Sequence, residues 1–224
     1  MLKRDIKQML LLDDCSGWVI KRKVNSIKDL TLTEKAVFQK IIFFQDKHDK
    51  KSRITNLRIA LFYGLTSQYI YKIIKSLLEK DYLKINYKDG NREIEINTTI
   101  MPQLEIYQYA ESLWVDKMIA LVKDLSIKEK FILGEIHNKS KEKYFFGSNN
   151  YLAKKFGIGE VQISRIITTI KKKDYFTVSI RKKINNRTAK MYTERRIVLS
   201  GGNKRQMERN AVENLGEVDD SILR

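Results

Sequence analysis

Residues 148–178 read SNNYLAKKFGIGEVQISRIITTIKKKDYFTV and decide the predicted fold. They predict a short helix over 151–156, a reversal of the chain at Gly157 and a second helix over 160–173. The second helix carries isoleucines at the i, i+3, i+4, i+7 spacing of one buried face: Ile163, Ile166, Ile167 and Ile170. Two short helices, a glycine turn and a polar, cationic outer face on the second helix are typical of a helix-turn-helix.

The same pattern occurs once more, earlier in the chain. Setting Ala60 on Ala153 places Gly64 on Gly157 without a gap. The core positions then coincide, with Ile70, Ile73, Ile74 and Leu77 on the four isoleucines, and Lys80, Asp81 and Tyr82 on Lys173, Asp174 and Tyr175. Residues 31–35 also match 126–130 after a shift of about two residues. This internal repeat predicts two domains of one architecture, although it does not show that both bind the same ligand.

A β-hairpin is predicted after each helix-turn-helix. Residues 83–87 and 92–96 alternate like strands around an Asp89-Gly90 turn. Residues 175–180 and 190–199 repeat the arrangement around a more basic tip over 181–188. Three helices followed by such a wing make a winged-helix domain. The predicted fold class is therefore mainly α with small β-wings (α+β), with two tandem winged-helix domains at 30–99 and 125–199.

Three other segments complete the predicted organisation. Residues 1–29 form an N-terminal arm, which either packs Trp18 on the first domain or lays Lys21, Arg22 and Lys23 along DNA. Residues 100–124 form a connector, with a helix from about Gln103 to Asp124, which acts either as a linker or as a homodimerisation helix. Residues 200–224 are polar and mixed in charge, so we expect a flexible tail.

The chain is strongly basic, with a net charge of +17 and a pI of about 9.7. Residues 125–199 hold 18 Lys and Arg against 6 Asp and Glu (+12), and residues 30–99 hold 13 against 8 (+5). A lysine-rich composition could reflect an AT-rich genome alone. The excess nevertheless falls on the two repeats, which favours a polyanionic partner such as nucleic acid.

The single cysteine, Cys15, rules out an intrachain disulfide and favours a reducing, cytoplasmic setting. No apolar run approaches the roughly 20 residues that cross a bilayer. The apolar patch at 9–12 is too short for the core of a signal peptide.

No catalytic, metal or cofactor site can be assembled from the sequence, so we expect a protein that is not an enzyme. His48 and His137 have no ligand-spaced Cys, His or carboxylate beside them. A glycine-rich phosphate loop is also missing. Tyr69 and Tyr71 suggest a DNA-nicking tyrosine, but that chemistry needs a metal-binding histidine cluster. They are better interpreted as contacts to DNA or as partial core.

The exposed face of each second helix is the predicted reading surface for double-stranded DNA. Glutamine can pair with adenine, and Arg165 can pair with guanine. The lysines suit phosphates, and the cations of the second wing tip suit phosphates or an adjacent minor groove. The candidates are Ser67, Gln68, Tyr69, Tyr71, Lys72, Lys75, Lys154, Lys155, Glu160, Gln162, Ser164, Arg165, Thr168, Thr169, Lys171, Lys172, Arg181, Lys182, Lys183 and Arg187. For any one of them the alternative is a solvated surface. Two such domains in one chain could read half-sites about one helical turn apart.

The second repeat also resembles a known group of domains. Leu125, Ser126, Glu129 and Lys130 begin the shared pattern, which continues with Ser148, Asn149, Tyr151, Leu152, Ala153, Phe156, Gly157 and Ile158 before the isoleucine-striped helix. This pattern resembles the winged-helix domains of replisome organisers and of plasmid or phage replication initiators. No match to the helicase-loading domain of some replisome organisers is found.

The resemblance implies an origin-binding protein of a mobile element that works with the replication machinery. A transcriptional regulator of the same fold, acting with the transcription machinery, is one alternative. A winged-helix protein-interaction module without specific DNA binding is the other.

Overall fold

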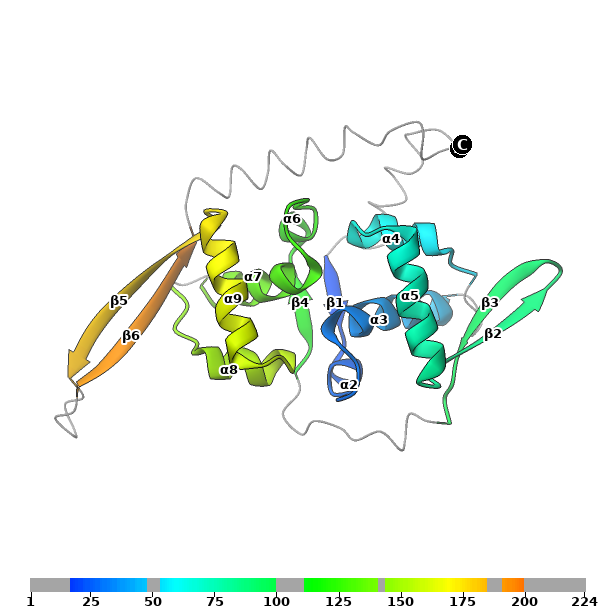
Figure 1. The fold of residues 1–224 in the computed structure, drawn as a ribbon, viewed down its shortest axis with the longest axis horizontal. Coiled ribbons are helices and arrows are strands. Elements are labelled where there is room, and N and C mark those ends of the chain that lie inside the picture. The colour runs from blue at the N-terminus through cyan, green and yellow to red at the C-terminus, as the bar shows by residue number, and fades with distance from the viewer. Residues whose placement is uncertain (1–16, 48–52, 100–110, 141–143, 185–190, 200–224) are drawn as a thin grey trace. The chain divides into compact units, whose positions relative to one another are not determined.

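The structure is a computed structural model that describes residues 17–47, 53–99, 111–140, 144–184 and 191–199. The chain divides into two compact units. We call Val19–Leu113 the N-terminal unit, and Trp18 with the described part of Trp114–Arg224 the C-terminal unit. The described residues form a mixed α+β structure of helices and small antiparallel sheets (Figure 1).

The chain carries the same series of elements twice. The first series is β1 (Trp18–Ile20), α2 (Arg22–Asn25), α3 (Leu32–Lys47), α4 (Asn56–Tyr63), α5 (Ser67–Glu79), β2 (Leu83–Lys88) and β3 (Asn91–Ile96). The second is β4 (Leu113–Val115), α6 (Lys117–Ala120), α7 (Ile127–Lys139), α8 (Asn149–Phe156), α9 (Glu160–Lys172), β5 (Phe176–Ile184) and β6 (Met191–Leu199). Strand β2 pairs antiparallel with β3, and β5 pairs antiparallel with β6.

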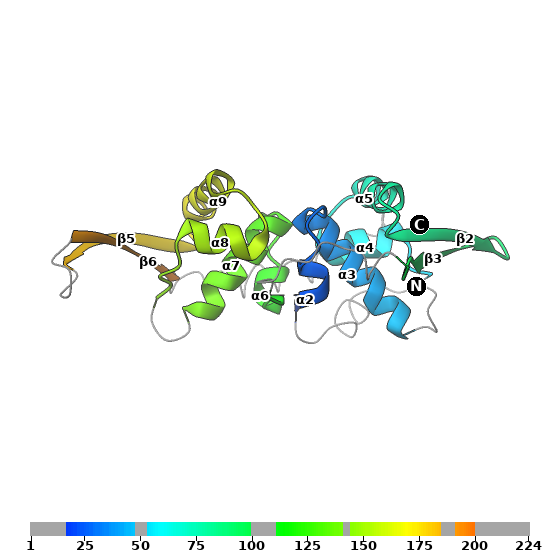
Figure 2. The same cartoon turned by 90° about the horizontal axis from the view of Figure 1, so that it is seen from below.

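Each core is built around one helix, α3 or α7, which we call the central helix of its unit. We call α5 and α9 the exposed helices. In the N-terminal unit α5 packs on α3 and α4, and in the C-terminal unit α9 packs on α7 and α8 (Figures 1 and 2). The predicted inward stripes are buried: Ile70, Ile73, Ile74 and Leu77 in α5, and Ile163, Ile167 and Ile170 in α9. Ile166 is half-buried. The i, i+3, i+4, i+7 spacing therefore predicted the buried faces of both helices.

The turn before each exposed helix is made by a glycine, as predicted. Gly64 and Gly157 cap α4 and α8 in the left-handed region, at φ +67° and +64°. A residue with a Cβ adopts this conformation at a cost, which explains glycine at both positions. Thr55 and Ser148 cap the N-termini of the same helices with their hydroxyl oxygens. With Ser148 as the N-cap, α8 begins two residues earlier than predicted.

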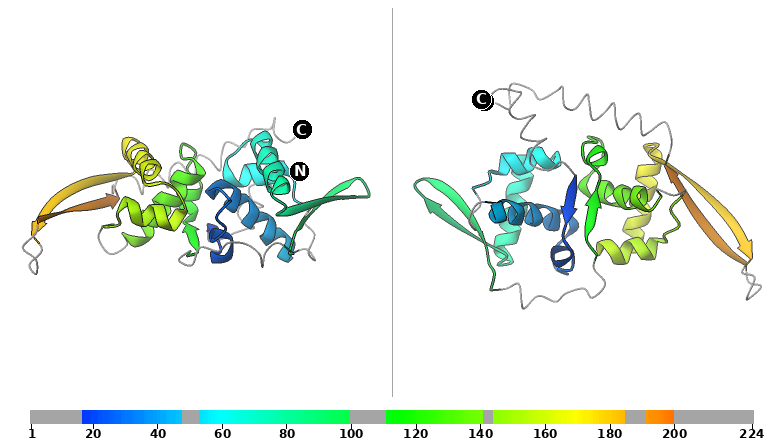
Figure 3. Two further views of the ribbon diagram at one scale, coloured as in Figure 1. Left: turned by 60° about the horizontal axis from the view of Figure 1, so that its bottom comes forward. Right: turned by 180° about the vertical axis from the view of Figure 1, so that it is seen from behind.

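The hairpins project from their units, as the views in Figure 3 show. In the first, Lys88 faces Asn91 across the two-residue Asp89-Gly90 turn, whose φ values of +52° and +75° are those of the turn predicted from Asp-Gly. The second is longer than predicted. Strand β5 extends to Ile184, so Arg181, Lys182 and Lys183 belong to a strand and not to the wing tip. Strands β5 and β6 form nine cross-strand pairs, from Phe176 with Leu199 to Ile184 with Met191, and these include the three cations.

The predicted connector helix over 103–124 is wrong for the residues that the structure describes; 100–110 lie outside them. Leu113–Val115 is a strand, and Asp116 then caps the short helix α6 by accepting a hydrogen bond from Met118 N at 2.8 Å. Burial alternates along the strand, which is the period of β-structure. Val115, Ile119 and Val122 are buried, and the homodimer remains a prediction.

The predicted N-terminal arm also differs. Residues 1–16 lie outside the described part of the chain, but β1 and α2 follow them, and the N-terminal unit begins at Val19 and not at residue 30. Trp18 belongs to the C-terminal unit and packs there. Its ring lies 6.1 Å from that of Phe131, with Lys130 Nζ 4.8 Å from its centroid, in the C-terminal unit. Lys21, Arg22 and Lys23 are exposed. The predicted tail lies outside the described residues.

A buried glutamate fixes the end of the exposed helix in each unit. In the N-terminal unit Glu34 and Thr31 exchange hydrogen bonds that cap α3, and Lys80, the C-cap of α5, donates to Glu34 Oε1 at 2.9 Å. Ser76 donates to the same oxygen at 2.6 Å. Tyr82 completes the contact by donating to Asp29 Oδ1 at 2.6 Å.

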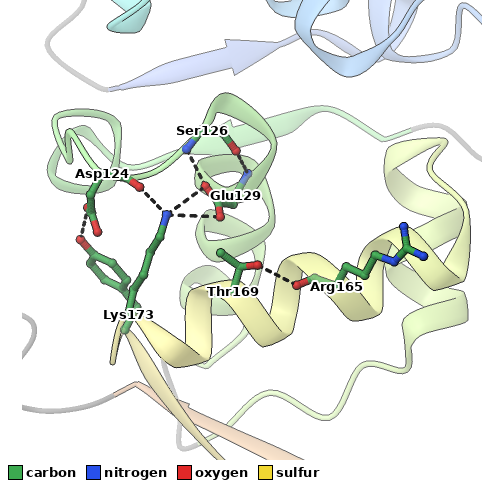
Figure 4. Close-up of polar contacts among 7 residues, drawn as sticks. Asp124, Ser126, Glu129, Arg165, Thr169 and Lys173 are labelled. Atoms are coloured by element: carbon green, nitrogen blue, oxygen red, sulfur yellow. Dashed lines mark hydrogen bonds and ion pairs between the residues drawn. The ribbon is translucent and has the colours of Figure 1, made fainter.

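The C-terminal unit repeats this arrangement (Figure 4). Ser126 and Glu129 form the capping box of α7, and Lys173 Nζ lies 3.4 Å from Glu129 Oε1 and donates to the carbonyl of Asp124. Tyr175 donates to Asp124 Oδ1 at 2.6 Å. We call each of these two sets of contacts the helix lock. It is centred on Glu34 and Lys80 in the N-terminal unit and on Glu129 and Lys173 in the C-terminal unit. Because the lock joins the start of the central helix to the end of the exposed helix, it fixes the direction of the exposed helix.

The pKa of Glu34 is lowered from 4.5 to about 2. Burial alone would raise it, but the hydrogen bonds from Ser76, Lys80 and Thr31 favour the carboxylate and outweigh the burial. Since the pKa is lower in the folded than in the unfolded chain, the stabilisation is present above pH 4.5 and is lost as the pH falls towards 2.

We therefore expect Glu34→Gln to lower the free energy of unfolding at pH 7 by about 2–3 kcal/mol. The difference from the wild type should shrink between about pH 4.5 and 2, as the wild-type carboxylate is protonated. Urea unfolding followed by circular dichroism across this range measures both effects. Glu79→Gln is the control, because the Lys75–Glu79 pair is exposed and 3.8 Å apart, and should change stability by less than about 0.5 kcal/mol. A pH-independent effect at Glu34 would contradict the role assigned to its charge.

Candidate nucleic-acid interface

The exposed face of α9 gathers most of the residues predicted for the second repeat. Its buried isoleucines turn toward α7 and α8, which leaves the opposite side in solvent. The residues predicted on it are all exposed, namely Glu160, Gln162, Ser164, Arg165, Thr168, Thr169, Lys171 and Lys172, and Val161 is exposed as well. Figure 4 shows the Arg165 side chain pointing away from the helix lock. We call this surface the α9 face.

Internal hydrogen bonds occupy part of the α9 face. Thr168 Oγ1 donates to the Ser164 carbonyl at 2.9 Å, and Thr169 Oγ1 donates to the Arg165 carbonyl at 3.0 Å. Both hydroxyls therefore present their oxygens, as acceptors, and their methyl groups. Glu160 Oε1 accepts from Asn150 Nδ2 at 2.7 Å. The Arg165 guanidinium makes no such bond within the described structure, so its donors are available to an acceptor outside the chain.

The matching surface of the N-terminal unit is the outer side of α5, which we call the α5 face. Its exposed residues are Ser67, Gln68, Tyr69, Tyr71, Lys72 and Lys75, again as predicted. Thr66 caps the helix by accepting from Tyr69 N at 3.2 Å. Tyr69 and Tyr71 are 45% and 57% exposed, so they lie outside the core, and the alternative of partial core is wrong for both.

Lys155 does not lie on the predicted surface. Its side chain is 8% exposed, and Nζ lies 3.0 Å from Glu135 Oε1, which also accepts from Tyr151 OH at 2.6 Å. Burial, followed by the Glu135 carboxylate, raises the pKa of Tyr151 to about 12. Lys154, one residue earlier, is exposed. The sequence Lys154-Lys155 gave no indication of this difference, because only the packing of α8 on its neighbours decides which lysine faces solvent.

The cations of the second wing are only partly described. Arg181 and Lys182 are exposed on β5. Lys183 lies in the same strand, and only its backbone is described. Arg187 lies outside the described residues. Two exposed cations therefore follow the C-terminal end of α9 along the strand.

An arginine that the sequence reasoning missed ties each wing to its helix-turn-helix. Arg195 in β6 donates to the carbonyl of Gly147 at 2.6 Å and to Asn149 Oδ1 at 2.7 Å, at the start of α8. Arg92 in β3 donates to the carbonyl of Ile54 at 3.0 Å, at the start of α4. Burial lowers the pKa of both guanidinium groups from its usual value.

The two arginines occupy equivalent places. Arg92 pairs with Tyr87 and Arg195 with Ile180, and Tyr87 and Ile180 coincide when the repeats are superimposed on their helix-turn-helix positions. The register of the hairpins could have identified the pair. The sequence alignment of the two repeats does not show this equivalence. The second wing is longer, so Arg195 lies further along the chain than the position that aligns with Arg92.

The described residues contain no group of three or more His, Cys, Asp or Glu that could hold a metal ion. His137 lies on α7, and His48 and Cys15 lie outside the described segments. Within the described segments, no helix has both the length and the apolar character needed to cross a membrane.

Comparisons of the chain with protein-family models and with curated proteins found no match.

The two neighbouring lysines of α8 allow a direct test of which one supports the fold. Lys155→Met should destabilise the protein by about 3 kcal/mol, because it leaves the buried Glu135 without its cation. Lys154→Met should leave the free energy of unfolding within about 0.5 kcal/mol of the wild type, since Lys154 is exposed. Thermal and urea unfolding of both variants measure the difference. Equal effects would show that the ion pair does not stabilise the unit.

Proposed function

We propose that the chain is a sequence-specific double-stranded DNA-binding protein built from two tandem winged-helix domains. The observation that carries the proposal is the exposed polar and cationic face of one helix in each unit, held by a helix lock and followed by a hairpin. A helix of this kind fits the major groove, where base edges differ in their donors and acceptors. The hairpin beside it suits the flanking backbone or minor groove.

The charge of the protein supports the same proposal. Lys171 and Lys172 at the end of α9, and Arg181 and Lys182 on β5, are all exposed. Lysines of this kind contact phosphates and supply affinity that falls with salt. Arg165 differs, because its planar guanidinium can donate two bonds to the O6 and N7 of one guanine. We therefore assign base reading to Arg165 and backbone contact to the surrounding lysines.

The biological role that we favour is replication initiation or origin binding in a plasmid or phage. It is supported by the resemblance of residues 125–178 to winged-helix domains of replication initiators. Transcriptional regulation by the same fold is the alternative. A plasmid carrying the bound sequence distinguishes them: if it replicates only when this protein is supplied, the replication role holds, and if it replicates equally without it, that role fails.

The direct test of DNA binding is selection of bound sequences from randomised duplex DNA by the purified protein, at several salt concentrations. We expect an enriched motif and an affinity that falls with salt, with a logarithmic slope of about 0.9 for each phosphate neutralised. Binding without an enriched motif would leave a non-specific basic protein. A lack of binding at moderate salt would favour the protein-interaction alternative.

On the selected site, we expect Arg165→Ala to weaken binding by about 1–3 kcal/mol and to relax preference at one base pair. Lys172→Ala should weaken binding to all sequences alike and reduce the salt slope by about 1, because it removes a phosphate contact. Titrations of the two variants on matched and single-mismatch duplexes measure the contrast. If Arg165→Ala behaved like Lys172→Ala, Arg165 would not read a base.

A further inference from the structure

Helices α5 and α9 share most of their inward residues and differ in their outward ones. Superimposing the repeats on Gly64 and Gly157 aligns α5 with α9 position by position. Three of the four inward residues are identical: Ile70 matches Ile163, Ile73 matches Ile166 and Ile74 matches Ile167. The fourth pair, Leu77 and Ile170, is buried in both units and has the same number of side-chain atoms. The interior of the helix is therefore interchangeable between the repeats.

The outward residues are different at every aligned position of the reading surface. The α5 face presents Ser67, Gln68, Tyr69, Tyr71, Lys72 and Lys75. At the same six positions α9 presents Glu160, Val161, Gln162, Ser164, Arg165 and Thr168, all exposed. A protein that reads one sequence twice is expected to present side chains of matching chemistry twice, because each base edge is recognised by particular donors, acceptors and methyl contacts.

The chemistry of the two faces differs as well as their sequence. At the six aligned positions α5 carries two phenols and two ammonium groups beside one amide, whereas α9 carries a guanidinium, a carboxylate, an amide and a valine that is 69% exposed. Tyr69 stands where the α9 face has Gln162, so a large ring replaces an amide that can pair with adenine. Lys72 stands where the α9 face has Arg165, so a single ammonium replaces a two-donor fork.

We propose that the DNA target of this protein is composite: two different half-sites, each read by one unit, which form neither a palindrome nor a direct repeat. This inference rests on the proposed function, since it specifies the sequence that the two faces recognise. The helix lock of each unit supports this proposal. Because Glu34 with Lys80 and Glu129 with Lys173 anchor both helices in the same way, each unit presents a differently composed face in the same local orientation.

The shared interior makes an exchange of faces the sharpest test. The grafted variant carries Ser67→Glu, Gln68→Val, Tyr69→Gln, Tyr71→Ser, Lys72→Arg and Lys75→Thr, so that these six positions of α5 carry the aligned residues of α9. Each change lies at an exposed position, and each buried isoleucine is kept. The reverse graft, which places the six residues of α5 onto α9, is the matched control. Circular dichroism and thermal unfolding check that both variants fold like the wild type.

Selection from randomised duplex DNA with the full-length wild type should enrich two unlike half-sites. The graft should enrich two copies of one of them, and the reverse graft two copies of the other. On the wild-type site each graft should bind at least about tenfold more weakly, because several base contacts are lost in one half-site.

Two results would overturn the composite target while leaving DNA binding intact. One is two identical half-sites for the wild type. The other is a single half-site that does not change when the α5 face is replaced. A wild type that enriches no sequence at all would instead refute the proposed function, so the two failures are distinguishable.

Discussion

One buried carboxylate in each unit fixes the end of the exposed helix against the start of the central helix. Glu34 and Glu129 cap the central helix with one set of bonds and hold a lysine at the end of the exposed helix with another. A buried carboxylate without these partners would cost several kcal/mol, so the two helices are ordered together. The neighbouring Lys35 and Lys130 extend this order by donating to the last carbonyls of α2 and α6, at 2.6 and 2.7 Å, and burial lowers the pKa of both to about 8.

The residues that stabilise each unit are different from those that its exposed helix presents to solvent. The lock and the isoleucine stripe recur in both units, whereas the residues on the outer side of α5 and α9 do not. Substitution on a solvent-exposed helix face changes stability little, so the faces are free to diverge after a duplication. The core residues are not, because each fills a packed space and a change in volume is felt at once. A repeat of this kind can acquire a second specificity without a second fold.

The wings illustrate how a cation can serve structure instead of binding. Arg92 and Arg195 use their guanidinium groups to hold the hairpin to the start of the preceding helix. Lys155 likewise pairs with a buried glutamate. A high net charge therefore overstates the number of cations available to a polyanion. The exposed cations of the described residues, among them Lys171, Lys172, Arg181 and Lys182, are the more direct measure of the charge available to a partner.

The sequence by itself determined the elements whose cause is local. Period 3.6 in the isoleucines, left-handed glycines at 64 and 157 and the Asp89-Gly90 turn predicted the helices, their turn and the first hairpin, because backbone geometry and burial of one face act within a few residues. Only the tertiary structure decided the strand at Leu113–Val115, the inward turn of Lys155 and the arginine ties. Each depends on a partner distant in the chain: Lys155 faces inward because Glu135 is buried beside it, and Arg195 reaches Gly147 because two strands hold it there. A single sequence carries no local signal for such pairings.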